Sequence, residues 1–155
     1  MIKNKNLIII DYSCHPFSLD LANNLANKKI HVHYIFSKNI NLTGNYYKSF
    51  KNKFLRFHLI DLNYIPKHKF IKRRAKEIQF GQKAIEKIDK LNPYKIILAN
   101  LPIDPLYSLI SYCKNKYIDS YFWVQDIYHV AIKNVLKKNF LFYFFFGYFI
   151  YKFYY

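Results

Sequence analysis

The feature that most constrains the fold of this chain is an alternation of short apolar runs with segments of helical periodicity. NLIIID, residues 6–11, has four consecutive apolar residues before Asp11, the pattern of a strand buried on both faces. SLDLANNLANKK follows, with Ser18 as the expected N-cap of a helix. IHVHYIF, residues 30–36, then alternates as a second strand. Strand, helix and strand within about thirty residues predict a βαβ unit.

The same alternation continues along the rest of the chain. FLRFHLIDL, residues 54–62, predicts a third strand, and KIILA, residues 95–99, predicts a fourth. A helix from about residue 106 to residue 116 leads into YFWV, residues 121–124, which has the pattern of a buried strand. The longest expected helix covers residues 70–91, and its predicted apolar face consists of Ile71, Ala75, Ile78 and Ile85, with Ile88 at its edge. The sequence therefore predicts an α/β fold with a parallel sheet and helices on both faces.

In such a sheet, ligands bind beyond the carboxyl ends of the strands. That rule brings together DYSCHPF after the first strand, ANLPID after the fourth and VQDIYH after the fifth. Asp126 in the last segment can act as a base toward a hydroxyl group or bind a sugar by hydrogen bonds. The alternative is a helix N-cap, because DIYHVAIKNVL begins a helical pattern and Asp is a favoured cap.

The glycines and histidines limit which cofactors the chain can hold. Gly44, Gly81 and Gly147 are the only glycines, and none follows the first strand, so neither a dinucleotide fingerprint nor a P-loop is present. His31 and His33 lie two apart on a predicted strand and could share a metal, but the sequence supplies no third ligand. No metal site is predicted.

The net charge of +16 comes almost entirely from lysine, because only three of the 25 basic residues are arginine. Nucleic-acid binding is not expected, since bidentate recognition of phosphates and base edges favours arginine. We expect the excess of positive charge to attract the protein to an anionic membrane surface. Two distant cysteines, and an N-terminal apolar run too short for a signal peptide, indicate a cytoplasmic protein.

The chain closes on a strongly aromatic segment, FLFYFFFGYFIYKFYY, residues 140–155. As a helix it would extend about 24 Å, less than the roughly 30 Å of bilayer hydrocarbon, so a transmembrane span is not predicted. Two interpretations stay open: a helix lying in a membrane interface, and a core helix whose partners belong to a continuation of the chain. Residues 1–139 are predicted to form the preceding domain.

Three stretches resemble one protein family in register. DYSCHPFSLDLANNLANKKIHVHYIFS, residues 11–37, resembles the first βαβ unit of bacterial family 4 glycosyltransferases of the colanic-acid-biosynthesis type, including a His-Pro-Phe run. IKRRAKEIQFGQKAIEKIDKLNPYKIILANLPID, residues 71–104, is similar to their long helix with Arg, Glu and Gly and to the strand after it. YFWVQDIYHVAI, residues 121–132, looks like their Trp-x-Gln-Asp segment, the most specific of the three.

The resemblance implies that the chain is the Rossmann-like, acceptor-side N-terminal half of a truncated GT-B fold. Carried over residue by residue, it implies a catalytic Asp126 and substrate-binding residues in three places, namely His15 and Pro16, Arg74 and Glu77, and Gln125. No cofactor is expected within this chain, because the resemblance assigns the nucleotide-sugar donor to a missing C-terminal domain.

The expected function is that of a fragment of an enzyme that moves a sugar from a nucleotide donor to an acceptor hydroxyl in surface-polysaccharide biosynthesis. The fragment is expected to be inactive alone, at the inner face of the membrane. Its expected partners are a sugar or lipid-linked acceptor, a polypeptide carrying the donor domain and a peripheral membrane contact. The alternative is a non-catalytic membrane-associated or partner-binding module, whose working part would be residues 140–155.

Overall fold

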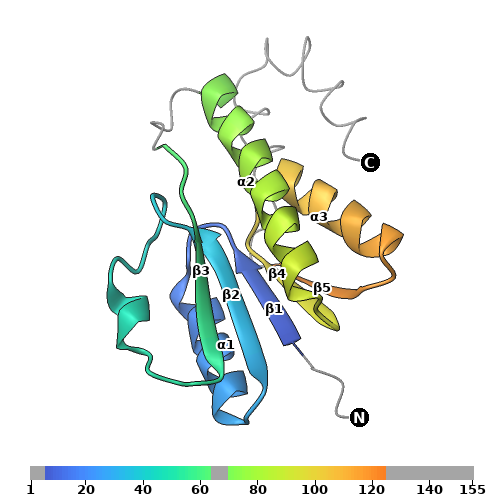
Figure 1. Ribbon diagram of the computed structural model, residues 1–155. Helices are drawn as coiled ribbons and strands as arrows, with labels where there is room; N and C mark the ends of the chain where they lie inside the picture. The colour runs from blue at the N-terminus through green and yellow to red at the C-terminus, as the bar shows by residue number, and fades with distance from the viewer. Residues whose placement is uncertain (1–5, 64–69, 125–155) are drawn as a thin grey trace. The chain divides into compact units, whose positions relative to one another are not determined.

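The computed structural model of the protein describes residues 6–63 and 70–124. Five parallel strands form one sheet in the order β3-β2-β1-β4-β5 (Figure 1). The elements in chain order are β1 (Asn6–Asp11), α1 (Pro16–Asn27), β2 (His31–Ser37), η1 (Tyr46–Ser49), β3 (Leu55–Ile60), α2 (Phe70–Leu91), β4 (Lys95–Ala99), α3 (Ile103–Asn115) and β5 (Asp119–Trp123). The predicted Rossmann-like α/β fold is confirmed.

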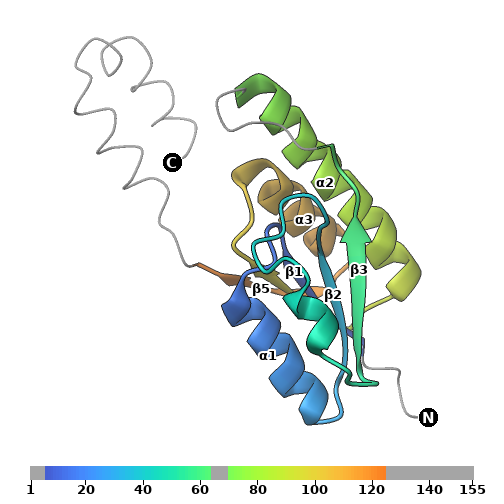
Figure 2. The ribbon, with the colours of Figure 1, turned by 90° about the vertical axis from the view of Figure 1, so that its left-hand side faces the viewer.

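Helices cover both faces of the sheet, with α1 on one face and α2 with α3 on the other (Figure 2). Successive residues of a strand point to opposite faces. Ile8 and Ile10 of β1 accordingly pack in the cluster under α2 and α3, whereas Leu7 and Ile9 pack in the cluster under α1. The unbroken apolar run of β1 thus follows from its place at the centre of a sheet covered on both sides.

The first helix begins two residues earlier than its expected N-cap. His15 is the N-cap, with no side-chain capping hydrogen bond, and Pro16 opens α1, where its missing N–H is not needed. Ser18 is therefore a buried residue of the first turn, and the prediction that it caps the helix is wrong. Its hydroxyl group is used by the network around Asp11, described below.

The predicted apolar face of α2 is only partly correct. Ile85 packs against the core and Ile88 is buried, as predicted, but Ile71 is 88% exposed and Ile78 is 42% exposed; Phe80 and Ala84 are buried in their place. The exposure of Ile71 follows from a mismatch of lengths: the 22 residues of α2 extend about 33 Å, while the six residues of β1 extend about 20 Å. The N-terminal turns of α2 consequently pass beyond the carboxyl edge of the sheet (Figure 1).

The fifth strand differs from its prediction as well. YFWV was expected to be buried, but among the described strands β5 lies at an edge, with β4 as its only neighbour, and residues 119–124 are all exposed. An edge strand lacks a second neighbour to cover its side chains and backbone groups. The described residues up to Trp123 belong to one compact unit. The predictions for residues 125–155, including the aromatic tail, lie outside the described residues.

Among the helices that the structure describes, none has both the length and the apolar character needed to cross a membrane.

Candidate active site

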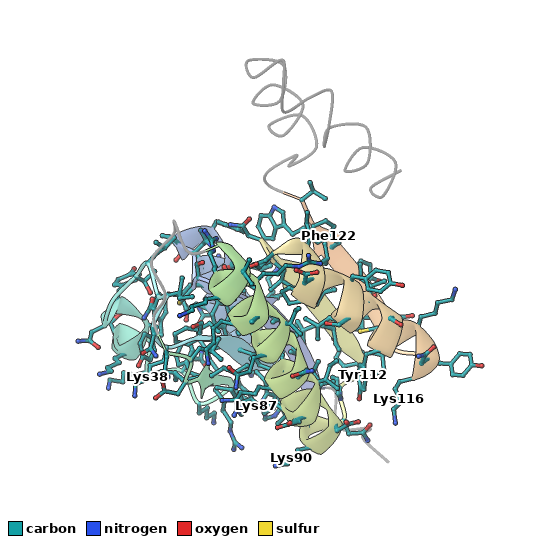
Figure 3. The ribbon with its side chains drawn as sticks, turned by 90° about the horizontal axis from the view of Figure 1, so that it is seen from above. Lys38, Lys87, Lys90, Tyr112, Lys116 and Phe122 are labelled. Atoms are coloured by element: carbon teal, nitrogen blue, oxygen red, sulfur yellow. The ribbon has the colours of Figure 1, made fainter. Side chains whose placement is uncertain are left out.

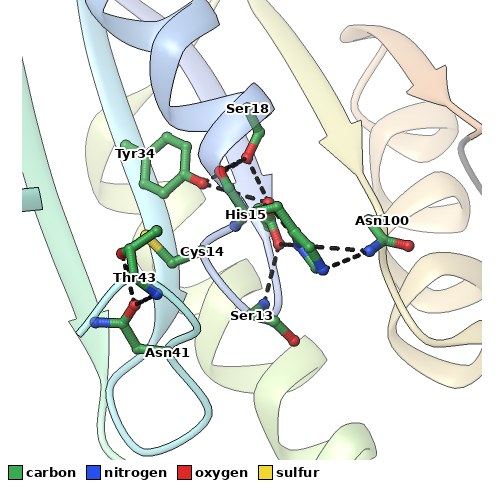
Figure 4. Close-up of polar contacts among 9 residues, drawn as sticks. Ser13, Cys14, His15, Ser18, Tyr34, Asn41, Thr43 and Asn100 are labelled. Atoms are coloured by element: carbon green, nitrogen blue, oxygen red, sulfur yellow. Dashed lines mark hydrogen bonds and ion pairs between the residues drawn. The ribbon is translucent and has the colours of Figure 1, made fainter. Parts of the chain in front are cut away.

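Asp11, the last residue of β1, is fully buried at the carboxyl edge of the sheet and accepts several hydrogen bonds (Figure 4). The backbone N–H groups of Ser13 and His15 donate to its carboxylate at 3.0 and 2.9 Å. The Ser18 hydroxyl also donates to it, and the Tyr34 hydroxyl lies 3.4 Å from Oδ2. A buried carboxylate is tolerated when donors of this kind replace its water. These hydrogen bonds therefore hold both the Asp11 side chain and the surrounding loop in place.

The loop between β1 and α1 folds back on Asp11 through an unusual backbone conformation at Cys14. Its φ is 53°, in the left-handed region that side chains other than glycine rarely adopt. The Cys14 thiol is buried and lies 3.3 Å from the Thr43 hydroxyl, and burial raises the pKa of that thiol. Cys14 therefore shapes and anchors the loop and is not an activated nucleophile.

The same loop brings the His15 imidazole against the carboxylate of Asp11. Nδ1 lies 2.8 Å from Oδ1 and, because a carboxylate only accepts, Nδ1 carries the proton. Nε2 is then the acceptor of a neutral ring, and the side-chain amide of Asn100 donates to it at 2.8 Å. The His15 side chain is 19% exposed. This arrangement is a carboxylate–imidazole pair with a basic nitrogen near the surface.

Asn100 follows β4 directly and has a positive φ of 44°, a conformation that asparagine tolerates better than most residues. Its contact with His15 joins two of the three segments that the sequence places at the carboxyl edge, DYSCHPF and ANLPID. Of the third segment, VQDIYH, only Val124 is described.

Two aromatic rings extend the site beside His15. The Phe17 ring centroid lies 5.6 Å from that of His15 and 4.8 Å from that of Trp123, the latter edge to face. Trp123 is 38% exposed at the end of β5. Aromatic faces beside a few fixed polar groups are typical of small-molecule sites.

On α2, Arg74 and Glu77 are held by ion pairs. Arg74 contacts Asp104 of α3 through two nitrogens, at 2.8 and 3.0 Å. Glu77 accepts from Arg73 at 2.8 Å, and burial raises the pKa of Glu77 against the lowering effect of Arg73.

The buried Tyr12 hydroxyl has no hydrogen-bond partner within the described residues. Burial, with a further contribution from the charge of Glu77, raises the pKa of Tyr12 to about 12. The Tyr12 ring packs edge to face on Phe80 at 4.9 Å, so Tyr12 belongs to the core beneath α2.

Gly81, the third residue of the helical part of the resemblance, lies where α2 packs against α3. A Cβ added there would meet Ser108 Oγ at 2.8 Å and Pro105 Cα at 3.1 Å. The absence of a side chain at this position allows the two helices to approach closely.

The structure thus places the predicted residues in different settings. His15 and Pro16 stand at the carboxyl edge, and Arg74 and Glu77 stand in ion pairs on α2. The predicted catalytic Asp126, with Gln125, lies outside the described residues. Sequence reasoning missed Asp11 and Asn100 as parts of a site. The available signal was an acid that ends the first parallel strand with a histidine four residues later.

In the two described ranges, no group of three or more His, Cys, Asp or Glu side chains could hold a metal ion. His33, considered above with His31 as a ligand pair, is instead hydrogen-bonded through Nδ1 to His58 Nε2 at 2.8 Å.

No family model matches the chain, and no curated protein matches it. Among solved structures, this chain is similar to two structures of the C-terminal domain of a hydrogenase from Pyrococcus furiosus. One has a TM-score of 0.63 at 9% identity, covering 80% of this chain and 94% of that domain. The other has a TM-score of 0.59 at 12% identity, covering 79% and 94%.

A third solved structure is a ugt transferase from Siraitia grosvenorii in complex with UDP. It has a TM-score of 0.42 at 13% identity, and the match covers 77% of this chain and 27% of the transferase. At such identities the similarities to the hydrogenase domain concern the fold alone, which is a Rossmann-like α/β domain.

Proposed function

We propose that this chain is the acceptor-side domain of a nucleotide-sugar-dependent glycosyltransferase, in which His15 is the base for the acceptor hydroxyl. The observation that carries the proposal is the pairing of buried Asp11 with His15 at the carboxyl edge of the sheet. The resemblance to family 4 glycosyltransferases, read from the sequence, supports the same substrate class.

In the proposed reaction, an acceptor hydroxyl oxygen attacks the anomeric carbon of the donor sugar. The bond from that carbon to the diphosphate oxygen breaks, and the nucleoside diphosphate leaves with the electron pair. His15 Nε2 takes the hydroxyl proton, and Asp11 stabilises the resulting imidazolium while it holds the ring in place. The acceptor hydroxyl replaces the Asn100 amide at Nε2, so the neutral, Nδ1-protonated ring is the reactive form.

The donor must be bound by a polypeptide segment other than the described loops, because the β1–α1 loop has no glycine to cradle a diphosphate. This chain is accordingly proposed to bind the acceptor but to transfer no sugar by itself. Asp126 remains a prediction for the same proton transfer, with helix capping as its other role. Substituting His15 and Asp126 separately, in a transfer assay that also contains the donor-binding segment, assigns the base.

Trp123 gives a direct test, because it is the only tryptophan and its ring contacts Phe17 in the site. We expect oligosaccharide or lipid-linked sugar acceptors to change tryptophan emission in a saturable way. His15→Ala and Asp11→Asn should each weaken that binding about tenfold or more. His15→Ala removes the imidazole, and Asp11→Asn removes the charged partner that holds the imidazole in place. Asp20→Asn, the same change at an exposed position of α1, is the matched control.

The proposal fails if no acceptor of either class changes the emission of a chain whose circular dichroism shows a folded α/β domain. It also fails if Asp20→Asn weakens binding as much as Asp11→Asn. Sugar transfer by the 155-residue chain alone would contradict the separate donor segment.

A further inference from the structure

A cavity of about 310 Å³ lies at the opposite, amino-terminal edge of the sheet from His15. Its polar lining comes from four elements, with Asn6 at the start of β1, His31 and His33 on β2, Arg56 on β3 and Lys90 in the last turn of α2. Val32, Phe54 and Leu91 complete the wall. The volume is near the lower limit for sites that bind small metabolites.

The charges on this lining are all of one sign. Arg56 and Lys90 both face the cavity, and no carboxylate lines it. Within residues 6–63 and 70–124, neither side chain has an ion-pair or hydrogen-bond partner. Lys87 lies one turn before Lys90 at the same end of α2 (Figure 3). Two exposed cations, Arg56 and Lys90, therefore line one hollow.

Capping of α2 accounts for neither cation. Asn6 Nδ2 donates to the Leu91 carbonyl at 3.0 Å, and the Asn92 N–H donates to the Ile88 carbonyl at 3.0 Å. These two carbonyl groups of the last turn are thus served by other residues. Arg56 also comes from β3, so its place beside Lys90 is a property of the tertiary structure.

The histidines beside the cavity respond to this positive charge. His33 is 7% exposed and pairs with His58 across β2 and β3. Burial is the main cause that lowers the pKa of both rings, to about 4 for His58. The charges of Arg56 and His31 lower the pKa of His33 further, and those of His33, Lys87 and Arg56 lower the pKa of His58 further. The charge contributions to both shifts are smaller than that of burial, and their direction is that of positive surroundings, which favour an anion.

We propose that this cavity binds a phosphate group, either free or as the monoester of a small metabolite, between Arg56 and Lys90. The Arg56 guanidinium offers a planar fork of N–H donors to two phosphate oxygens, and Lys90 supplies a point charge from the facing helix. Donors from separate elements suit a tetrahedral oxyanion, because its oxygens point in several directions. The site is independent of the glycosyltransferase proposal, since it lies at the other edge of the sheet.

Binding can be measured on the full chain by calorimetry and by NMR of the histidine rings. Inorganic phosphate and glycerol 3-phosphate are the two probes, and acetate is the control anion. We expect one or both phosphates to bind and to raise the pKa of His58 and His33, because a nearby anion stabilises the imidazolium form. A preference for glycerol 3-phosphate identifies a monoester ligand, and equal affinities identify the phosphate group alone.

Arg56→Gln and Lys90→Gln should each weaken phosphate binding about tenfold or more, because each removes a charged donor. Lys114→Gln, which makes the same change of charge on an exposed part of α3, should leave the affinity unchanged. Circular dichroism checks that both cavity variants fold. The proposal is overturned if neither phosphate binds, if acetate binds as tightly, if Lys114→Gln has an equal effect, or if binding leaves the pKa values of His33 and His58 unmoved.

Discussion

At the scale of single residues, Asp11 has several structural roles. Its carboxylate turns the β1–α1 loop through the N–H groups of Ser13 and His15, and it holds the imidazole of His15 in one tautomer. It also draws in Ser18 from α1. One acidic side chain thus joins the strand, the loop, the helix and the candidate base, so its replacement affects stability and binding together.

Asp11→Asn is expected to lower the free energy of unfolding by about 2–4 kcal/mol, because the amide nitrogen that replaces one carboxylate oxygen cannot accept the hydrogen bonds made there. Urea denaturation followed by circular dichroism measures the change. Asp20→Asn, on the exposed side of α1, should change the free energy by no more than about 0.5 kcal/mol. An equal loss in the two variants would contradict the role given to the network.

The His33–His58 pair predicts a loss of stability in acid. The pKa of His58 is about 4 in the folded protein against an ordinary 6.5, so the unfolded chain binds the proton first as the pH falls. The free energy of unfolding should therefore decrease from about pH 6.5 toward pH 4, and His58→Asn should make that slope shallower. Denaturation series across this range, with Lys114→Gln as the control, measure the slopes. An unchanged slope in His58→Asn would refute this prediction.

At the scale of elements, α2 shows what periodicity can and cannot predict. The sequence predicts the helix and its ends correctly, but which of its faces is buried depends on which residues lie over the sheet. Ile71 and Ile78 have the right spacing for a core face but are exposed, whereas Phe80, Ala84 and Ile88 meet the strands. Burial is thus decided by the neighbouring elements, which the local pattern does not contain.

Gly81→Ala tests the contact between α2 and α3. Alanine favours a helix by about 1 kcal/mol over glycine, but its Cβ would stand 2.8 Å from Ser108 Oγ and 3.1 Å from the backbone of Pro105. We expect a net loss of about 1–2 kcal/mol in the free energy of unfolding, because overpacking outweighs the gain in propensity.

Gln82→Ala, at the exposed neighbouring position, is the control for helix propensity. Adding Ser108→Ala to Gly81→Ala should recover part of the loss, since it removes the closest atom. A Gly81→Ala protein more stable than the parent would show that the helices can separate without cost.

At the scale of the whole molecule, the order of strands follows from the βαβ alternation, and the sequence predicted the class of fold for that reason. It did not reveal that β5 lies at an edge, because an apolar run looks the same in a central strand and in an exposed one. It pointed to His15 through a resemblance, yet it left out Asp11 and Asn100. These two residues are 89 positions apart in the chain and become parts of one site only when β1 and β4 pair.

Strand order predicts how protection from hydrogen exchange should vary across the sheet. Ile8 to Ile10 in β1 are fully buried between two paired neighbours, so their amides should exchange most slowly. The amides of residues 119–123 in β5 should exchange faster, because that strand has one neighbour and exposed side chains. Exchange followed by NMR or mass spectrometry gives the order. Equal protection of β1 and β5 would mean that β5 is not an edge in solution.

The anchoring of the first loop has a consequence for how this protein could be altered. Cys14 touches Thr43, and the N–H of Leu42 donates to the Ser13 carbonyl at 2.8 Å, so the segment after β2 holds the turn that presents His15. These contacts depend on the length of the segment that follows β2. Inserting or deleting residues between 38 and 45 should therefore change the candidate site as much as a substitution within it.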